Sequence, residues 1–167
     1  MLAFMPEIST ASDRFDIDAR SPAVQVSSKT AVHLYFSDKE NSFLIAEERT
    51  LFHPGNPVEF GQIIVENLIQ GPREGLMGTI PPGTALRAVY LSEAKTAYVD
   101  VSTALKNEHP GGIQSELMTI FSIVNSLILN VPEIETVKIL INGQESATLA
   151  GHIDLRFPIK ANMLLIR

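Results

Sequence analysis

The segment Gly151-His152-Ile153-Asp154 places an imidazole two residues before a carboxylate. We predict a strand over residues 152–157, in which side chains two residues apart point to the same face. Together the two groups could begin a metal site, but such a site needs three or four ligands, and no His-x-His or Glu-x-x-His pair supplies the others. The alternative is a structural contact between His152 and Asp154, or hydrogen bonds to a nearby loop. The sequence therefore predicts no metal and no cofactor.

A second acidic set lies around the end of a predicted strand. Asp100 is followed by Ser102, and Glu116 lies near the start of the next helix. Two such carboxylates could act as general acid and base on a cell-wall glycan, with His152 and Asp154 nearby. Alternatively, Asp100 and Ser102 accept backbone N–H groups of the following turn, and Glu116 interacts favourably with the helix dipole. No set of nucleophile, base and orienting group can be assembled, which favours the structural interpretation and predicts that the protein is not an enzyme.

Two further features precede or lie within the second long helix. Gly111-Gly112 could hold a phosphate at a helix N-terminus, but no phosphate-binding motif accompanies it, and we interpret it as a tight loop. Asn125 lies between apolar helix positions, where a buried amide needs partners, and we expect these to be loop backbone groups. The candidate polar residues are thus Asp100, Ser102, Glu116, Asn125, His152 and Asp154.

The composition excludes several classes of function. Of 167 residues, 45% are hydrophobic and 19% charged, which is enough apolar surface for a core. The net charge of -6, with no cluster of Lys and Arg, argues against nucleic acid as a partner. The lack of cysteine excludes disulfides, thiolate metal sites and cysteine nucleophiles. No apolar run of about 18 residues is present, so no segment is predicted to span a bilayer.

Apolar periodicity predicts two ββα units followed by further strands. Hairpins are expected from Ala31 to Leu51 and over 85–101, with helices starting after Asn56 and Gly112. Strands are expected at 137–141, 152–157 and, at an edge, 163–166, and Asn142-Gly143 indicates a hairpin turn. Because neither helix would be stable alone, we predict an α+β fold with two helices on one face of a mainly antiparallel or mixed sheet.

The first 28 residues differ in composition from the rest. Serine, threonine, aspartate and proline are mixed there with apolar residues that follow neither a helical nor a strand period. We predict an N-terminal tail or tether remnant over residues 1–28 and a single domain over residues 29–167.

Nine short motifs in order resemble the GerMN domain, the sporulation and spore germination domain of bacterial envelope proteins. They cover residues 31 to about 158, and Ser126 stands where much of the family is expected to have threonine. The motifs are VHLYF (32–36), Glu48-Arg49, LIQGP (68–72), IPPGT (80–84), AYVDVS (97–102), Gly112 with Glu116, IVNSL (123–127), VKILING (137–143) and GHID (151–154).

The resemblance implies an extracytoplasmic location, in the periplasm or on the outer face of the cytoplasmic membrane. Contact with the membrane would then be made only through an N-terminal anchor that precedes the sequence. The fold is expected to be similar to ring-building motifs, and the family implies no catalytic residues. The expected function is a non-enzymatic envelope interaction or assembly module that binds another envelope protein or itself. A glycan-binding or glycan-acting domain is the alternative.

Overall fold

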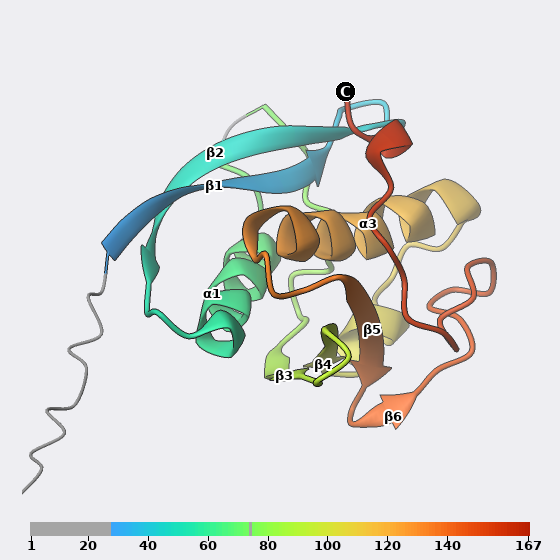
Figure 1. Cartoon of the computed structure of the whole chain (residues 1–167). Helices are drawn as coiled ribbons and strands as arrows, with labels where there is room; N and C mark the ends of the chain where they lie inside the picture. The colour runs from blue at the N-terminus through green and yellow to red at the C-terminus, as the bar shows by residue number, and fades with distance from the viewer. Residues whose placement is uncertain (1–27, 74) are drawn as a thin grey trace, which may run out of the picture.

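The computed structural model describes residues 28–73 and 75–167, which form two β-sheets with two long helices between them (Figure 1). The α+β class and the order ββα, ββα, ββ are confirmed, with a short helix added before the second long one. Apart from Ser28, the predicted tail lies outside the described residues. The elements are β1 (Ser28–Ser37), β2 (Leu44–His53), α1 (Pro57–Gln70), β3 (Leu86–Leu91), β4 (Thr96–Val101), α2 (Ala104–Asn107), α3 (Ile113–Asn130), β5 (Thr136–Ile141), β6 (Gln144–Glu145) and a 3-10 helix (Met163–Leu165).

The first sheet is the antiparallel hairpin of β1 and β2, paired without a register shift from Ser28↔His53 to Ser37↔Leu44. One edge of this hairpin is covered by polar side chains of α3. The Ser126 hydroxyl accepts the Tyr35 N–H, the Ser122 hydroxyl donates to the Tyr35 carbonyl, and the Asn130 amide pairs with both backbone groups of His33. These residues lie four apart and therefore share one face of the helix. The helix thus takes the place of a third strand beside β1.

The second sheet has the order β3-β4-β5-β6 and is mixed, since β3 and β4 are antiparallel and β4 and β5 are parallel. The predicted turn at Asn142-Gly143 is confirmed. Both residues have positive φ, 51° and 75°, as a two-residue hairpin turn requires. This turn brings the β5–β6 connection next to the end of β4, where Asp100 lies.

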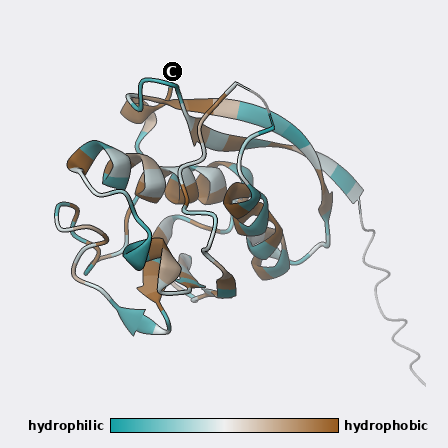
Figure 2. Ribbon diagram, turned by 180° about the vertical axis from the view of Figure 1, so that it is seen from behind, coloured by the Kyte–Doolittle hydropathy of each residue, from teal (hydrophilic) through white to brown (hydrophobic). Residues whose placement is uncertain are grey.

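The helices differ from the prediction in that both of their sides are covered. Ile120, Ile123, Val124 and Leu127 form one apolar face of α3, as predicted, but the opposite side of the helix is buried as well. Residues buried on that side include Met118, Thr119, Ser122 and Ser126. A helix that is buried on most of its circumference needs partners on several sides, and buried hydroxyl groups need hydrogen-bond partners there. The strands therefore divide into two sheets, and Figure 2 shows hydrophobic segments on the helices and on the strands that face them.

The start of α1 is confirmed as predicted. Asn56 is the N-cap, and its side-chain oxygen accepts the N–H groups of Val58 and Glu59 at 2.8 and 3.2 Å. Pro57 occupies the first helical turn, where its missing N–H costs nothing. The cap fixes where the chain turns from β2 into the helical layer.

The strands predicted over residues 152–157 and 163–166 are wrong. The first region makes only a single bridge, Thr148↔Asp154, and the second contains a 3-10 helix with one bridge, Leu44↔Ile166. In the first region, Glu116 of α3 binds the N–H groups of His152 and Ile153 in place of a neighbouring strand. Just before the second region, Asn125 of α3 binds the backbone of Asn162. Polar and apolar residues do alternate over residues 152–157, as in a strand. The backbone there binds a helix side chain and not a neighbouring strand.

Candidate functional site

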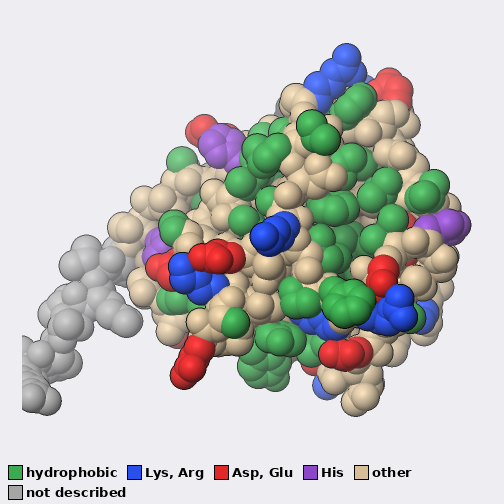
Figure 3. Space-filling model, turned by 45° about the vertical axis from the view of Figure 1, so that its right-hand side comes forward, with side chains coloured by type: hydrophobic (Ala, Val, Ile, Leu, Met, Phe, Trp, Pro, Cys, Tyr) green, Lys and Arg blue, Asp and Glu red, His purple; other side chains and the backbone are tan. Residues whose placement is uncertain are grey.

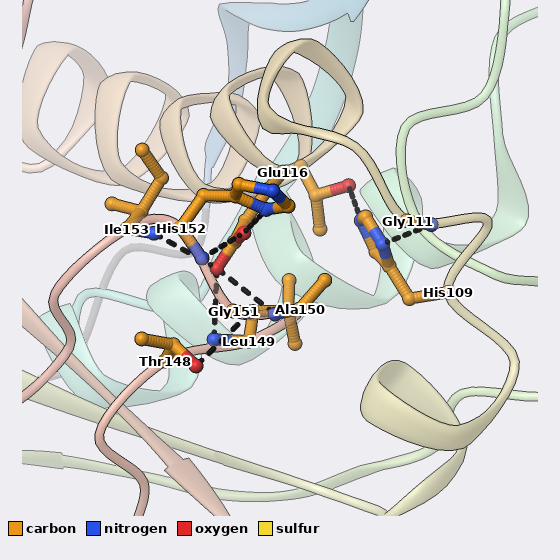
Figure 4. Close-up of polar contacts among 10 residues, drawn as sticks. His109, Gly111, Glu116, Thr148, Leu149, Ala150, Gly151, His152 and Ile153 are labelled. Carbon is orange, nitrogen blue, oxygen red and sulfur yellow. Dashed lines mark hydrogen bonds and ion pairs between the residues drawn. The ribbon is translucent and has the colours of Figure 1, made fainter.

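Glu116, in the first turn of α3, is the centre of the largest polar cluster that the sequence analysis pointed to (Figure 4). Its side chain is fully buried. One carboxylate oxygen accepts the N–H groups of Leu149, Ala150 and Ile153 at 2.9–3.2 Å. The other accepts the backbone N–H of His152 at 2.9 Å and faces its ring Nδ1 at 3.0 Å. The carboxylate therefore holds the loop 149–153 against the helix.

The surroundings of Glu116 favour the charged form of its carboxylate. Burial opposes the charged form, but the hydrogen bonds from the Ala150, Ile153 and His152 N–H groups and from the His152 ring outweigh it. The pKa of Glu116 is consequently lowered from its ordinary value. Every accepting position is used internally, so Glu116 is not available to an external glycan.

His152 and Asp154 do not form one site. Because the strand predicted for them is absent, His152 turns inward to Glu116, whereas Asp154 turns to Arg156. Asp154 accepts the backbone N–H and the guanidinium of Arg156 at 2.9–3.0 Å, and these bonds lower the pKa of Asp154 to about 2. The predicted contact between His152 and Asp154 is therefore replaced by a hydrogen bond between His152 and Glu116 and by an ion pair between Asp154 and Arg156.

Asp100 and Ser102 also serve the backbone, but not in the turn that follows them. One oxygen of Asp100 accepts the Gly143 N–H at 2.7 Å, and the other accepts from the Arg87 guanidinium at 3.0 Å. The Ser102 hydroxyl accepts the Ala85 N–H at 2.9 Å. Both residues accept backbone N–H groups, but the prediction that these belong to the following turn is wrong: the partners are Gly143 in the β5–β6 turn and Ala85, just before β3.

Asn125 binds loop backbone, as expected. Its amide donates to the Asn162 carbonyl at 3.1 Å and accepts the Asn162 N–H at 2.9 Å. Glu116 and Asn125 thus fix two stretches of the C-terminal segment to α3, nine residues apart on the helix. Of the six candidate residues, the structure brings Glu116 and His152 into direct contact.

A surface groove that the sequence analysis did not identify lies on the other side of the first turns of α3. It has a volume of about 450 Å³, within the range of small-ligand sites. We call it the loop–helix groove. It is lined by Lys39, Asn41, residues 77–82, Glu108, Pro110, Ser115, Met118 and Thr119. The signal in the sequence is the Gly- and Pro-rich stretch from Gly75 to Thr84, which forms one wall of the groove.

The loop–helix groove combines apolar walls with charges of both signs. Met77, Pro81, Pro82 and Met118 supply apolar surface, and Lys39 and Glu108 supply the charges. The Glu108 carboxylate lies over Gly83, where a Cβ atom would collide with both carboxylate oxygens. A glycine at position 83 is therefore required for Glu108 to lie as it does.

His109 anchors the wall of this groove through a chain of hydrogen bonds. Its Nδ1 accepts the Gly111 N–H at 3.0 Å, so the ring donates from Nε2 to the Thr119 hydroxyl at 3.1 Å. The Thr119 hydroxyl in turn donates to the Thr79 carbonyl in the loop. Burial lowers the pKa of His109, against opposing contributions from Glu116 and from the Ser115 backbone. The neutral imidazole is the form that fits.

We predict that acidification from pH 7 to pH 5 destabilises the protein partly through His109. Because the folded pKa of His109 lies below its ordinary 6.5, this contribution is present above pH 6.5 and is lost as the pH falls below it. Urea unfolding at several pH values measures the effect. The variant His109→Gln keeps a donor for Thr119 but does not titrate, so its stability should depend less on pH over this range. An equal pH dependence in the variant would contradict the assignment.

The fold and these sites define a class: a small mixed α+β domain whose buried carboxylate and amide groups anchor loops beside an open groove. Within residues 28–73 and 75–167, no cluster of three or more His, Cys, Asp or Glu residues could hold a metal ion. Among the helices described, none is long and apolar enough to cross a membrane. The chain belongs to the Germane family, sporulation and spore germination, whose model matches residues 33–147. The resemblance inferred from the sequence is thereby confirmed.

Solved structures share this fold. The first GerMN domain of the sporulation protein GerM from Bacillus subtilis is 23% identical, with a TM-score of 0.62 over 80% of this chain and 96% of that one. The tandem GerMN domains of the same protein are 24% identical, with a TM-score of 0.59, and the chain spans 45% of their length. A crystal structure described as "Putative Lipoprotein from Clostridium perfringens" is 23% identical, with a TM-score of 0.59 over 80% of this chain and 88% of that one. Comparison with curated proteins gives no match.

Proposed function

We propose that this domain is a non-enzymatic interaction module of the bacterial cell envelope, which binds another envelope protein or a second copy of itself. Its location would be outside the cytoplasmic membrane, held by an N-terminal anchor that precedes the described residues. Membership of the sporulation and spore germination family supports the envelope assignment. A relative described as a lipoprotein supports an anchored form.

The observation that carries the proposal is the loop–helix groove. Its walls are formed by prolines, whose backbone is already restricted, and by methionines, which adapt to different side chains. Apolar walls with a cation and an anion at the rim suit an extended peptide, because a peptide offers apolar side chains together with charged or polar backbone groups. We therefore propose that the groove binds an exposed segment of a partner protein.

The glycan alternative has less support in the described structure. It depended on Glu116, which is buried and fully hydrogen-bonded, and on Asp154, which is paired with Arg156. Asp100 is also buried and bound to Gly143 and Arg87. Among the described residues, Glu108 is the one acidic residue that lines the loop–helix groove. Acid/base hydrolysis of a glycan requires two carboxyl groups.

Peptides selected from a displayed random library provide the test of the groove. We predict that Met77→Asp weakens binding of a selected peptide at least about tenfold, which corresponds to roughly 1.4 kcal/mol, because it places a charge on an apolar wall. Isothermal titration calorimetry measures the affinity. Met77 is 49% exposed, so the substitution should leave the fold intact.

Met163→Asp is the matched control. Met163 is 56% exposed and lies with Leu164 and Phe157 on the C-terminal segment, a side of the molecule where Figure 3 shows many hydrophobic side chains. Unchanged affinity in this variant supports binding in the groove. If Met163→Asp abolished binding and Met77→Asp did not, the partner would dock on the C-terminal segment and the groove proposal would be wrong.

Protease accessibility of the protein in intact spheroplasts tests the proposed location.

A further inference from the structure

The outer edge of β2 is a second surface of the molecule with unused binding capacity. In an antiparallel strand, every second residue directs its backbone groups to the same edge. Leu44 binds Arg167 at the edge of β2 that faces away from β1, so residues 46, 48, 50 and 52 direct their backbone groups to that edge too. None of the described residues hydrogen-bonds these four N–H or carbonyl groups. Their side chains are exposed as well. Figure 1 shows β2 on the side of β1 that faces away from α3.

This edge lacks several of the features by which proteins prevent strand addition, and its charged residues Glu47 and Arg49 are bound to each other. Strand β2 is ten residues long, pairs with β1 without a bulge, and contains no lysine or proline. A long, regular and exposed edge of this kind is a template for pairing with another strand. The opposite edge of the same hairpin is closed by Ser122, Ser126 and Asn130. The β1 edge of the hairpin is thus covered by α3, whereas the β2 edge is open over residues 46–52.

We propose that β2 pairs in antiparallel fashion with β2 of a second copy of this chain, about a two-fold axis at Arg49. In this register Glu48 lies opposite Thr50 of the partner and Ala46 opposite Phe52, so that a small side chain faces a large one. Each of these pairs exchanges two backbone hydrogen bonds. Phe52, which is 51% exposed in the single chain, gains apolar cover.

The two neighbouring registers of the β2–β2 pair are less favourable, so the edge can pair with its own copy in one preferred register. A shift of two residues in one direction places Glu48 opposite Glu48, where like charges repel. The proposed register places Arg49 opposite Arg49, but each of these side chains is bound to the Glu47 of its own chain at 2.6 Å. The shift that opposes the two Glu48 residues also requires Leu44, whose carbonyl already accepts the Arg167 N–H at 3.0 Å. The opposite shift pairs Glu48 with Phe52 and moves Ala46 beyond the end of the partner strand, so that hydrogen bonds are lost. A second copy therefore fits this edge over 46–52.

Disulfide trapping tests the register in the full chain, which has no cysteine of its own. Glu48→Cys and Thr50→Cys proteins are prepared separately and mixed under mild oxidation. Opposed residues of such a pair have Cα atoms about 5.5 Å apart, within disulfide range. Identical residues would be diagonal, at about 7–8 Å. We expect at least about tenfold more mixed dimer than dimer of either variant alone. Equal yields would overturn the register and the proposal.

Proline substitution tests the edge itself by sedimentation equilibrium of the full chain. Thr50→Pro removes one outward N–H, which an edge strand tolerates, and should raise the dimer dissociation constant at least about tenfold. Ala31→Pro is the matched control, since Ala31 is exposed and lies directly opposite Thr50 in β1, on the other edge. A wild-type chain that stays monomeric to about 1 mM would overturn the proposal. So would a dimer that survives Thr50→Pro.

The biological meaning of this pairing rests on the proposed interaction function, but its test does not. Peptide affinity at the loop–helix groove reports on the proposed function, whereas disulfide yield and sedimentation report on β2. Failure of one leaves the other standing.

Discussion

Replacing Glu116 with glutamine is expected to lower the free energy of unfolding by about 3–5 kcal/mol. Glutamine has the same shape, but it carries no charge and presents an NH₂ group where the carboxylate accepts only. Whichever oxygen is replaced, backbone N–H groups of the loop 149–153 then face a donor. Buried donors left without acceptors cost their full desolvation penalty. Urea unfolding measures the change.

A matched control is Glu66→Gln, because Glu66 is an exposed glutamate on α1. This change should stay within about 0.5 kcal/mol. Hydrogen exchange adds a local readout, since the amides of Leu149, Ala150, His152 and Ile153 should lose protection in Glu116→Gln and keep it in the control. A cost below about 1 kcal/mol, with protection retained, would show that the loop does not depend on the carboxylate.

The same residue predicts part of the acid sensitivity. Since the folded pKa of Glu116 is below its ordinary 4.5, its contribution is present above pH 4.5 and is lost as the pH falls through the folded value. The stability difference between wild type and Glu116→Gln should therefore shrink in acid. Asp154 and Glu135 also have lowered pKa values. Wild type and Glu116→Gln both contain these two residues, so their contributions cancel in the stability difference between the two proteins.

The sequence was sufficient for the elements with strong local signals. The Asn56-Pro57 start of α1, the Asn142-Gly143 turn and the apolar face of α3 each depend on residues close in the chain, and the structure has them as predicted. The strand predicted over 152–157 failed for a physical reason. Its alternation was real, but Glu116, more than thirty residues away, binds the backbone that a neighbouring strand would have bound.

The candidate site shows the same limit. Residue types indicated that Asn125 needs hydrogen-bond partners and that His152 contacts Asp154 or a nearby loop, and the structure gives both residues partners. For Glu116 the sequence predicted only an interaction with the helix dipole and not the loop that it binds. The loop–helix groove could not be predicted, because it is formed between the loop 77–82 and α3 and has no motif of its own. The free edge of β2 was also hidden, since the sequence does not reveal that α3 closes the edge of β1 and leaves that of β2 open.

Replacing Arg49 with methionine is expected to cost about 3–5 kcal/mol, the range for breaking one half of a buried ion pair. The Arg49 side chain is 3% exposed and pairs with Glu47 at 2.6 Å. It also donates to the Asn67 and Gly71 carbonyls, and its guanidinium lies 5.3 Å from the centre of the Phe36 ring. Arg49 therefore ties the hairpin to the end of α1. Chemical denaturation measures the cost.

A double-mutant cycle separates the free energy of the Arg49–Glu47 ion pair from the cost of leaving the Glu47 charge without Arg49. Arg49→Met leaves the Arg73 N–H as the hydrogen-bond partner of the Glu47 carboxylate among the described residues. Glu47→Gln combined with Arg49→Met removes that charge. The double variant should be less destabilised than the sum of the single ones, by about 1–3 kcal/mol. Glu135→Gln, which breaks the exposed pair with Lys95, should change stability little. Additive costs at Glu47 and Arg49 would contradict the pairing.

Arg49 also distinguishes folding from assembly, because it lies at the centre of the proposed β2–β2 contact. Loss of Arg49 should lower stability and dimerisation together, since the hairpin is no longer held against α1. Thr50→Pro changes the outward face of the same strand and should lower dimerisation with a smaller loss of stability. If the two variants lost stability and dimerisation in the same proportion, the β2 edge would matter only through the fold of the hairpin. Different proportions would show that the edge is itself a binding surface.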